Sequence, residues 1–334
     1  MRHLAGLVLA AIITATVIAA QSVPNTIDGH VAAAKAAAGS EYGGIVDRLC
    51  TPPAPPPPRD ATAAAPRAPG PPARETWYAK PTKVFDNLYF VGMTEYSSWA
   101  VTTSDGIIII DPIFDYSVEE EVVNGLKSLN LDPKQIKYVL VSHGHSDHVG
   151  GASFLQDTFK AHVIMSEADW SLVENTRATW RKPKRDMIAT DGQKLTLGDT
   201  TLTLYITPGH TLGTISSLIP VRDGNQRHVA AYWGGTAFNW LSGSAAYITP
   251  DRPNSFWFNH YIESAERFRK AARDAGADVI LSNHTVFDGS KSKLPALAAR
   301  RPQDPHPYVV GADSVSRYLT VAEECAKAGL LRAK

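Results

Sequence analysis

Four potential metal ligands lie close together in the segment VSHGHSDHVGG at residues 141–151. They are His143, His145, Asp147 and His148. Zinc accepts imidazole and carboxylate ligands, so this cluster can converge on metal. In an extended turn His143 and His145 point the same way, whereas Asp147 and His148 reach a neighbouring position, and the spacing therefore favours two metal positions. A surface cluster of histidines without function is the alternative interpretation.

Two histidines further along the chain complete a larger set of donors. His210 lies in TPGHTLG and His284 in LSNHTVFDG, each directly after a short apolar segment that we expect to be a strand. Either histidine alone is typical of an ordinary loop. Together with the first cluster they supply three ligands for each of two ions and leave positions open for water, as a catalytic zinc site requires.

The segments that must position these ligands are short strands and amphipathic helices. We expect strands at residues 84–91, 99–102, 106–110, 136–142, 162–166, 194–197, 201–206, 229–233 and 279–282, and helices at 119–129, 152–159, 262–275 and 313–328. The strands come in two sets, each followed by helices. This order predicts an α+β protein with two mixed sheets packed face to face between outer helices. All the ligand candidates lie where a strand ends.

The N-terminal quarter of the chain has a different composition. Residues 1–20 have a short basic start and an apolar run that ends in small residues, which is typical of a signal peptide, with an uncleaved membrane anchor as the alternative. Residues 21–76 are rich in alanine and proline, which predicts a disordered extension. We therefore expect the folded domain at residues 77–334 of an exported protein, periplasmic or secreted, that contacts a membrane only if the N-terminal segment is uncleaved.

The cysteines and the charge balance add two constraints. Cys50 and Cys325 are the two cysteines of the chain, so an exported protein has either one disulfide or two unpaired thiols. Basic and acidic residues number 33 each, which does not indicate a nucleic-acid-binding protein. We expect a small-molecule substrate and no nucleic-acid partner, and the sequence leaves the oligomeric state open.

The histidines and aspartate described above resemble the signature of the metallo-β-lactamase superfamily, which is HxHxDH followed by two separated histidines. The resemblance covers roughly residues 77–334 and implies a metallo-β-lactamase-fold hydrolase domain, a four-layered αβ/βα sandwich that binds two Zn²⁺ ions. It implies that His143, His145 and His210 bind the first zinc ion. It implies that Asp147, His148 and His284 bind the second.

The strand between the last two histidines distinguishes subfamilies within this resemblance. Most of these hydrolases, glyoxalases and lactonases included, carry a metal-bridging aspartate there, and the first subclass of true lactamases carries a cysteine. This chain has Gly234 and Gly235 at that place. The third subclass of class B β-lactamases uses neither residue and binds its second zinc through an aspartate and two histidines. The chain is most similar to that subclass.

The resemblance implies a dinuclear zinc hydrolase that opens a β-lactam amide with a zinc-bound hydroxide, since metal binding lowers the pKa of water to about 7. The implied catalytic residues are Asp147, which ligates and orients, and His148. One alternative is a periplasmic zinc hydrolase of lactones, esters or other small cyclic amides. That alternative is favoured by the lack of the carboxylate-binding serines usual near this strand, where the chain has Gly235 and Thr236. Another is a non-catalytic zinc-binding protein.

A substrate pocket is predicted from the polar and aromatic residues that follow this strand. The candidates are Thr236, Asn239, Trp240 and His260. The alternative for the aromatic run around His260 is core packing, because aromatic side chains mostly bury area. Asp111, at the end of GIIIID, is a candidate for orienting a metal-bound histidine.

Overall fold

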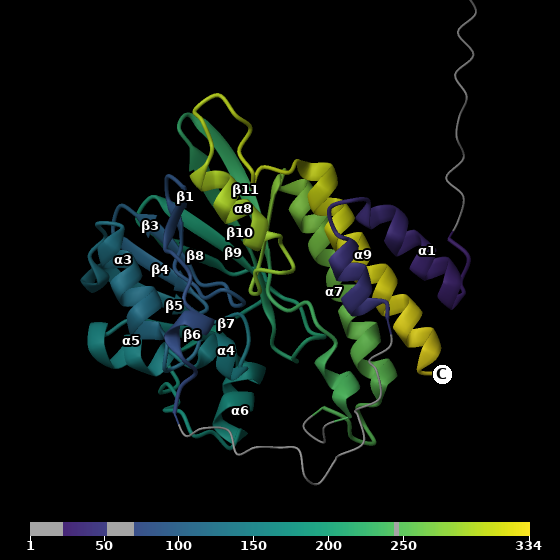
Figure 1. Ribbon diagram of the computed structural model, residues 1–334. Helices are drawn as coiled ribbons and strands as arrows, with labels where there is room; N and C mark the ends of the chain where they lie inside the picture. The colour runs from purple at the N-terminus through teal and green to yellow at the C-terminus, as the bar shows by residue number, and fades with distance from the viewer. Residues whose placement is uncertain (1–22, 52–69, 244–246) are drawn as a thin grey trace, which may run out of the picture.

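Two mixed β-sheets pack face to face in this computed structural model, which describes residues 23–51, 70–243 and 247–334 (Figure 1). The first sheet is, in spatial order, β1 (Thr82–Phe85), β2 (Leu88–Phe90), β3 (Trp99–Thr103), β4 (Gly106–Ile110), β5 (Ile136–Leu140), β6 (His162–Ser166) and β7 (Met187–Ala189). The second is β12 (Val279–Ser282), β11 (Gln226–Trp233), β10 (Ile215–Asp223), β9 (Thr200–Ile206) and β8 (Lys194–Leu197). The predicted signal peptide at residues 1–20 lies outside the described residues.

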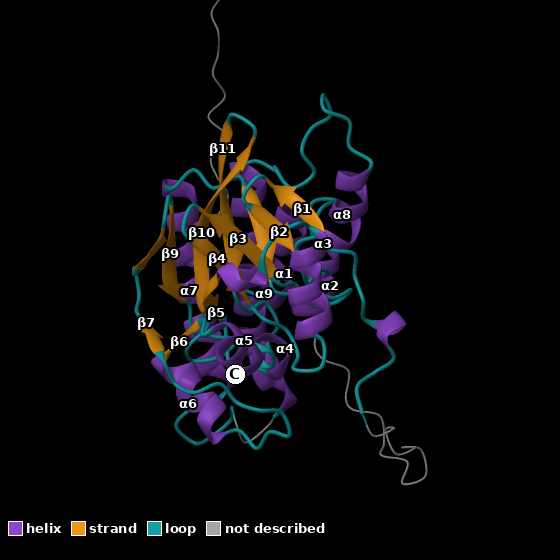
Figure 2. Ribbon diagram, turned by 90° about the vertical axis from the view of Figure 1, so that its left-hand side faces the viewer, coloured by secondary structure: helices purple, strands orange, loops and turns teal. Residues whose placement is uncertain are grey.

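Helices cover the outer face of each sheet. The first sheet is covered by η2 (Glu119–Val123), α3 (Asn124–Ser128), α5 (Ala152–Phe159) and α6 (Glu167–Asn175), and the second by α7 (Asn254–Asp274) and α9 (Ala312–Arg332) (Figure 1). Helices α1 (Ile27–Ala38) and α2 (Gly43–Leu49) pack on α9. The short α4 (Ser146–Val149) follows β5, and α8 (Ser290–Ala298) lies beside β1 (Figure 2). The arrangement confirms the predicted α+β fold, a four-layered αβ/βα sandwich.

Strand β4 shows how the sequence specifies these layers. Its residues GIIII are all buried. Ile107 and Ile109 pack into the cluster beneath the outer helices, whereas Ile108 and Ile110 pack into the cluster between the two sheets. Successive side chains of a strand point to opposite faces, so a strand covered on both sides reads as a continuous apolar run.

The N-terminal extension is ordered over most of its described length, which corrects the prediction of disorder for residues 21–76. Helices α1 and α2 form within this range, and the part at residues 52–69 lies outside the described residues. The prediction failed because composition does not report tertiary contacts. A helix of this length is marginal alone, but α1 buries Ala34 and Ala38 in the cluster that contains α9.

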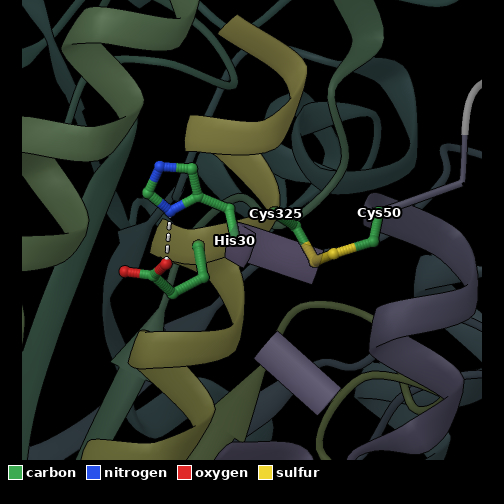
Figure 3. The surroundings of a disulfide bond; sticks show 4 residues. His30, Cys50 and Cys325 are labelled. Carbon is green, nitrogen blue, oxygen red and sulfur yellow. Dashed lines mark hydrogen bonds and ion pairs between the residues drawn. A yellow bond between two sulfur atoms is a disulfide. The ribbon is translucent and has the colours of Figure 1, made fainter. Parts of the chain in front are cut away.

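Two further contacts hold the extension to the C-terminal helix (Figure 3). Cys50 and Cys325 form a disulfide, which decides between the two alternatives left open by the sequence. The imidazole Nδ1 of His30 lies 2.7 Å from a carboxylate oxygen of Glu324, and both side chains are nearly buried. Within the described ranges, no helix combines the length and the apolar character needed to cross a bilayer.

Buried Glu121 in η2 gives the fold a pH-dependent weakness. Its side chain is fully buried, Oε1 accepts a hydrogen bond of 2.9 Å from the Ala79 backbone N–H, and Oε2 has no hydrogen-bond partner among the described residues. Burial raises the pKa of Glu121 to about 8. Because the pKa of Glu121 is higher in the folded chain than in the unfolded chain, the protonated side chain favours the folded state. This contribution to stability is fully present below about pH 4.5 and is lost as the pH rises through about 8.

We therefore expect Glu121→Gln, which keeps the acceptor but cannot ionise, to gain stability relative to the parent chain as pH rises. The difference in free energy of unfolding should move in favour of the variant by about 2 kcal/mol between pH 6 and pH 9. Denaturant unfolding at both values measures it. Glu120→Gln, at an exposed residue paired with Arg74, is the control and should show no such change. A Glu121→Gln difference independent of pH would contradict the assignment.

Candidate metal centre

Six side chains meet where strands of both sheets end. His143, His145, Asp147 and His148 follow β5, with the last two in α4. His210 follows β9, and His284 follows β12. The ligand atoms form two groups of three, and within each group all lie within 4.8 Å of one another. The structure thus divides the donors as the sequence resemblance implied.

The first group consists of three histidines whose ring nitrogens face one another. His210 Nε2 lies 3.1 Å from His143 Nε2 and 3.2 Å from His145 Nδ1. On the other side of two of these rings, His143 Nδ1 is 2.9 Å from the carbonyl oxygen of Gly234, and His210 Nδ1 is 2.6 Å from that of Ala237. Those carbonyls accept the Nδ1 protons, so both Nε2 lone pairs are directed at a common point.

The second group adds a carboxylate to two imidazoles. His148 Nε2 lies 3.3 Å from His284 Nε2 and 3.2 Å from an oxygen of Asp147, and the same oxygen is 3.7 Å from His284. Asp147 and His284 keep about a fifth of their side-chain surface exposed, whereas His148 is fully buried. The group is therefore reachable from solvent on one side.

Burial keeps most of these imidazoles in the neutral form that binds metal. Desolvation, assisted by neighbouring imidazoles, lowers the pKa of His145 and of His284 to about 3. Burial also lowers the pKa of His210 to about 4. A neutral imidazole nitrogen is the form that coordinates a cation.

Asp147 of the second group and Asp111 beside it compensate positive charge. Burial raises the pKa of Asp147, but His148 and His284 outweigh it and hold the pKa well below its ordinary range. Burial lowers the pKa of His148, but Asp147 and Asp111 outweigh it and raise the pKa to about 10. A divalent cation supplies the charge that these carboxylates otherwise draw from a proton on His148. Chemistry and placement of the donors therefore fit a metal ion in each group.

Asp111 lies where the sequence placed it, beside a ligand candidate. Its Oδ2 is 3.1 Å from His148 Nδ1. The carboxylate also accepts hydrogen bonds from Ser142, through both its backbone N–H (2.6 Å) and its hydroxyl (2.7 Å), and from the Tyr232 hydroxyl (2.6 Å). Its backbone φ of 56° is one that non-glycine residues rarely adopt. These contacts hold the His148 ring in one orientation.

Asp169, in α6, is a supporting residue that sequence reasoning missed. Its buried carboxylate accepts hydrogen bonds from the backbone N–H of Gly144 (2.8 Å) and of Gly213 (3.0 Å) and from the Thr211 hydroxyl (2.9 Å). Burial raises its pKa to about 6. The residue ties the loop of the first two histidines to the loop of His210. No local pattern in α6 signals that role.

The two glycines after β11 exclude any further ligand from that strand. A Cβ at Gly235 would lie 2.5 Å from the Cβ of His210, and a Cβ at Gly234 would lie 1.9 Å from the carbonyl oxygen of Ile215. Real Cβ atoms do not approach other atoms so closely. Neither a bridging aspartate nor a cysteine can therefore be accommodated at these positions.

A cavity of about 750 Å³ opens over the ligands. His145, Asp147, His210 and His284 lie in its wall. The other lining side chains that matter here are Arg48, Arg177, Trp180, Asn239, Tyr247 and Phe287. The cavity is large enough for a small molecule of drug size.

Of the four predicted pocket residues, Asn239 alone lines this cavity, with Nδ2 3.5 Å from His210 Nε2. The other three predictions are wrong. Thr236 is buried with its hydroxyl 3.2 Å from that of Tyr318, and Trp240 is buried and stacked on Trp257. His260 packs on its own helix, its Nδ1 2.8 Å from the Phe256 carbonyl oxygen. The aromatic run is thus core and helix packing, the alternative considered for it.

Tyr247 is a cavity residue that the sequence did not reveal. Its hydroxyl contacts His145 Nε2. Burial raises the pKa of Tyr247, so the hydroxyl keeps its proton and remains a hydrogen-bond donor. An isolated tyrosine in a loop has no pattern that distinguishes it.

Comparisons with known proteins agree with this architecture. The metallo-beta-lactamase superfamily model matches residues 92–223. The subclass B3 metallo-beta-lactamase BJP-1 of Bradyrhizobium japonicum is 24% identical, with a TM-score of 0.59 over 73% of this chain and 91% of that one. A metallo-beta-lactamase of Cronobacter sakazakii is 25% identical, with a TM-score of 0.62 over 78% of this chain and 99% of that one.

Curated sequences include relatives with a different name. A hydroxyacylglutathione hydrolase of Acidiphilium cryptum is 24% identical over 237 residues, which are 71% of this chain and 85% of that protein. One from Mesorhizobium japonicum is 29% identical over 121 residues, or 43% of its length. The fold and the ligand groups define a protein of the αβ/βα sandwich class with two potential metal positions. Residues 92–223 match the metallo-beta-lactamase superfamily model, and the structural neighbours include the subclass B3 enzyme BJP-1.

The glycine constraint leads to a prediction about metal affinity. We expect Gly235→Ala to push the His210 ring out of the first group and to weaken metal binding there by at least about tenfold, since misplacing even an outer partner of a ligand costs about 10- to 100-fold. Competition with a chromophoric chelator measures it. Gly44→Ala is the matched control, because a Cβ at Gly44 meets no atom within 4 Å. Equal affinities for both variants would refute the steric argument.

Proposed function

We propose that this chain is a β-lactamase that binds two zinc ions and hydrolyses the amide of the β-lactam ring. The observation that carries the proposal is the donor set at the strand ends. One group has three histidines, and the other has an aspartate and two histidines. Gly234 and Gly235 leave no room for a bridging carboxylate or a cysteine. By the resemblance described above, this is the donor set of the third lactamase subclass.

Zinc is the proposed metal because five imidazoles and one carboxylate suit its ligand preference. When bound, zinc ions lower the pKa of water and polarise a carbonyl oxygen. The chain supplies the orientation. The carbonyls of Gly234 and Ala237 fix two histidine rings, and Asp111 fixes a third. Such preorganised ligands do not have to reorganise when the reaction proceeds.

Three side chains of the cavity can act on the reacting groups. Asp147 remains ionised, so its second oxygen can accept a hydrogen bond from a water molecule and orient it. The Tyr247 hydroxyl and the Asn239 amide are hydrogen-bond donors in the cavity wall beside the first group. They are placed to stabilise negative charge that develops on a carbonyl oxygen of the substrate.

We further propose that the protein is exported, periplasmic or secreted, and acts on small molecules. The Cys50–Cys325 disulfide supports export, because disulfides persist mainly in oxidising compartments. The composition of residues 1–20 supports it as well.

A second candidate is hydrolysis of a glutathione thioester. It is favoured by the Acidiphilium cryptum relative, which bears the name of such an enzyme. The crowding at Gly234 and Gly235 argues against it, since the glyoxalases of the resemblance carry a bridging aspartate there. Hydrolysis of lactones or esters is the remaining alternative reaction. It is favoured by the residues directly after β11, which are Gly234, Gly235 and Thr236 in place of serines, with the Thr236 hydroxyl turned to Tyr318.

We expect the full chain loaded with zinc to hydrolyse nitrocefin and a carbapenem, followed spectroscopically. A chelator should abolish the turnover, and added zinc should restore it. His143→Ala should lower kcat/KM by at least about 100-fold, because it removes a ligand where loss of an outer partner alone costs 10- to 100-fold. His162→Ala, at an exposed histidine on β6, is the matched control and should retain activity.

Parallel assays on a 2-hydroxyacyl glutathione thioester, a lactone and a simple ester separate the candidates. Turnover of one of these substrates with no effect on either β-lactam would overturn the proposed substrate and leave the hydrolase assignment intact. Two bound zinc ions with no turnover on any substrate would indicate a non-catalytic zinc-binding protein.

A further inference from the structure

The ordered N-terminal extension contributes one side chain to the metal cavity. Arg48, in the last turn of α2, lines the cavity together with His284 and Phe287. The Arg48 guanidinium lies 5.8 Å from the centre of the Phe287 ring. That ring in turn lies 5.6 Å from the ring of His284. Arg48 is therefore one aromatic ring away from a metal-ligand candidate.

The position of Arg48 is fixed by packing on the opposite side of α2. Ile45, Val46 and Leu49 are buried in the cluster that also contains Phe287 and α9. The next residue, Cys50, is joined by the disulfide to Cys325 of α9 (Figure 3). The arginine head group itself is exposed. A cation on a helix anchored in this way is held at the cavity without being buried.

Arg48 has no ion-pair partner in the part of the chain that the structure describes. Its guanidinium faces the ring of Phe287 instead of a carboxylate. Several other described arginines are paired, as Arg267 is with Asp191 and Arg317 with Asp313. The acidic residues of the cavity are engaged elsewhere. Glu95 pairs with Lys291, and Asp147 belongs to the second ligand group.

We propose that Arg48 binds a carboxylate of the substrate and determines specificity for anionic substrates. The inference rests on the proposed function in that the substrate reacts at the metal centre of this cavity. A guanidinium binds a carboxylate through two parallel hydrogen bonds, and an unpaired cation in a concave site attracts anions. Directly after β11 the chain has Gly234, Gly235 and Thr236 in place of serines, and the Thr236 hydroxyl faces that of Tyr318. Both β-lactams and glutathione thioesters carry carboxylates, so the role of Arg48 does not depend on which is hydrolysed.

A binding experiment tests Arg48 without requiring turnover. Zinc-loaded full chain is titrated calorimetrically with 3-mercaptopropionate and 6-mercaptohexanoate and with their methyl esters, whose thiolates bind zinc equally well. We expect Arg48→Ala to weaken binding of at least one acid by about tenfold and to leave its ester unchanged, as loss of a charge-assisted hydrogen-bonded pair predicts. Arg48→Lys, which keeps the charge, should lose less.

Two controls make the binding result specific. Arg332→Ala removes an exposed arginine from the last turn of another helix and should change neither acid nor ester binding. Arg177→Ala removes the other cavity arginine. The proposal is overturned if Arg48→Ala weakens the binding of acids and esters alike, or if it changes the binding of neither. It is also overturned if the preference for acids is lost in Arg177→Ala instead.

A kinetic experiment tests whether the disulfide acts through Arg48. For an anionic substrate that the enzyme turns over, Arg48→Ala should raise KM about tenfold and change kcat by less than about twofold, the signature of lost ground-state binding. Cys50→Ser with Cys325→Ser should raise KM similarly, and adding Arg48→Ala to that pair should have little further effect. Fully additive increases in KM would overturn the inference that the disulfide acts through Arg48. If the cysteine variant does not fold, the comparison of Arg48→Ala with Arg48→Lys still decides whether Arg48 binds the anion.

The two proposals fail in different ways. Inert β-lactams together with an Arg48-dependent preference for thiol acids would sink the lactamase assignment and keep the anion site. Hydrolysis of β-lactams with no effect of Arg48→Ala on binding or KM would keep the lactamase assignment and overturn the anion site.

Discussion

The buried carboxylate of Asp169 is the contact on which the geometry of the first ligand group depends. It accepts hydrogen bonds from the loops after β5 and after β9, which belong to different sheets. Without such a tie, the hydrogen bonds of the individual imidazoles, such as those of His143 and His210 to backbone carbonyls, would have to offset the loss of hydration by themselves. Asp111 performs the same task for His148. Two buried acids thus turn strand ends into a rigid coordination frame.

Close packing around the ligand groups limits which further side chains could bind metal there, and the donors set the charge of each position. The backbone after β11 passes so near His210 that only glycine fits at position 235. A neutral donor set on the first group and one carboxylate on the second give the two positions different net charge, so two identical ions there would differ in acidity. The two positions therefore differ in electrostatic potential before any ion or substrate binds.

The sequence predicted the parts of this structure that have a strong local signal. Apolar strands such as β4 and β5, and the ligands directly behind them, could be located because burial and spacing are written in consecutive residues. Strand β10 was missed because Ser216, Ser217 and Pro220 interrupt its apolar pattern, although the serines are buried in the sheet. Helices α1 and α2 were not expected to be ordered because they are stabilised by packing on α9, far away in sequence. Asp169, Tyr247 and Arg48 act only through tertiary neighbours.

The covalent link between Cys50 and Cys325 spans 275 residues and ties the cavity rim that bears Arg48 to helix α9. The segment that bears Arg48 precedes α9 in the chain, so it can dock on that helix only after α9 has been synthesised. A reduced chain therefore keeps every metal-ligand candidate but holds its rim by packing alone. The covalent attachment of the cavity rim thus depends on the redox state of its surroundings, whereas the metal-ligand candidates themselves contain no cysteine.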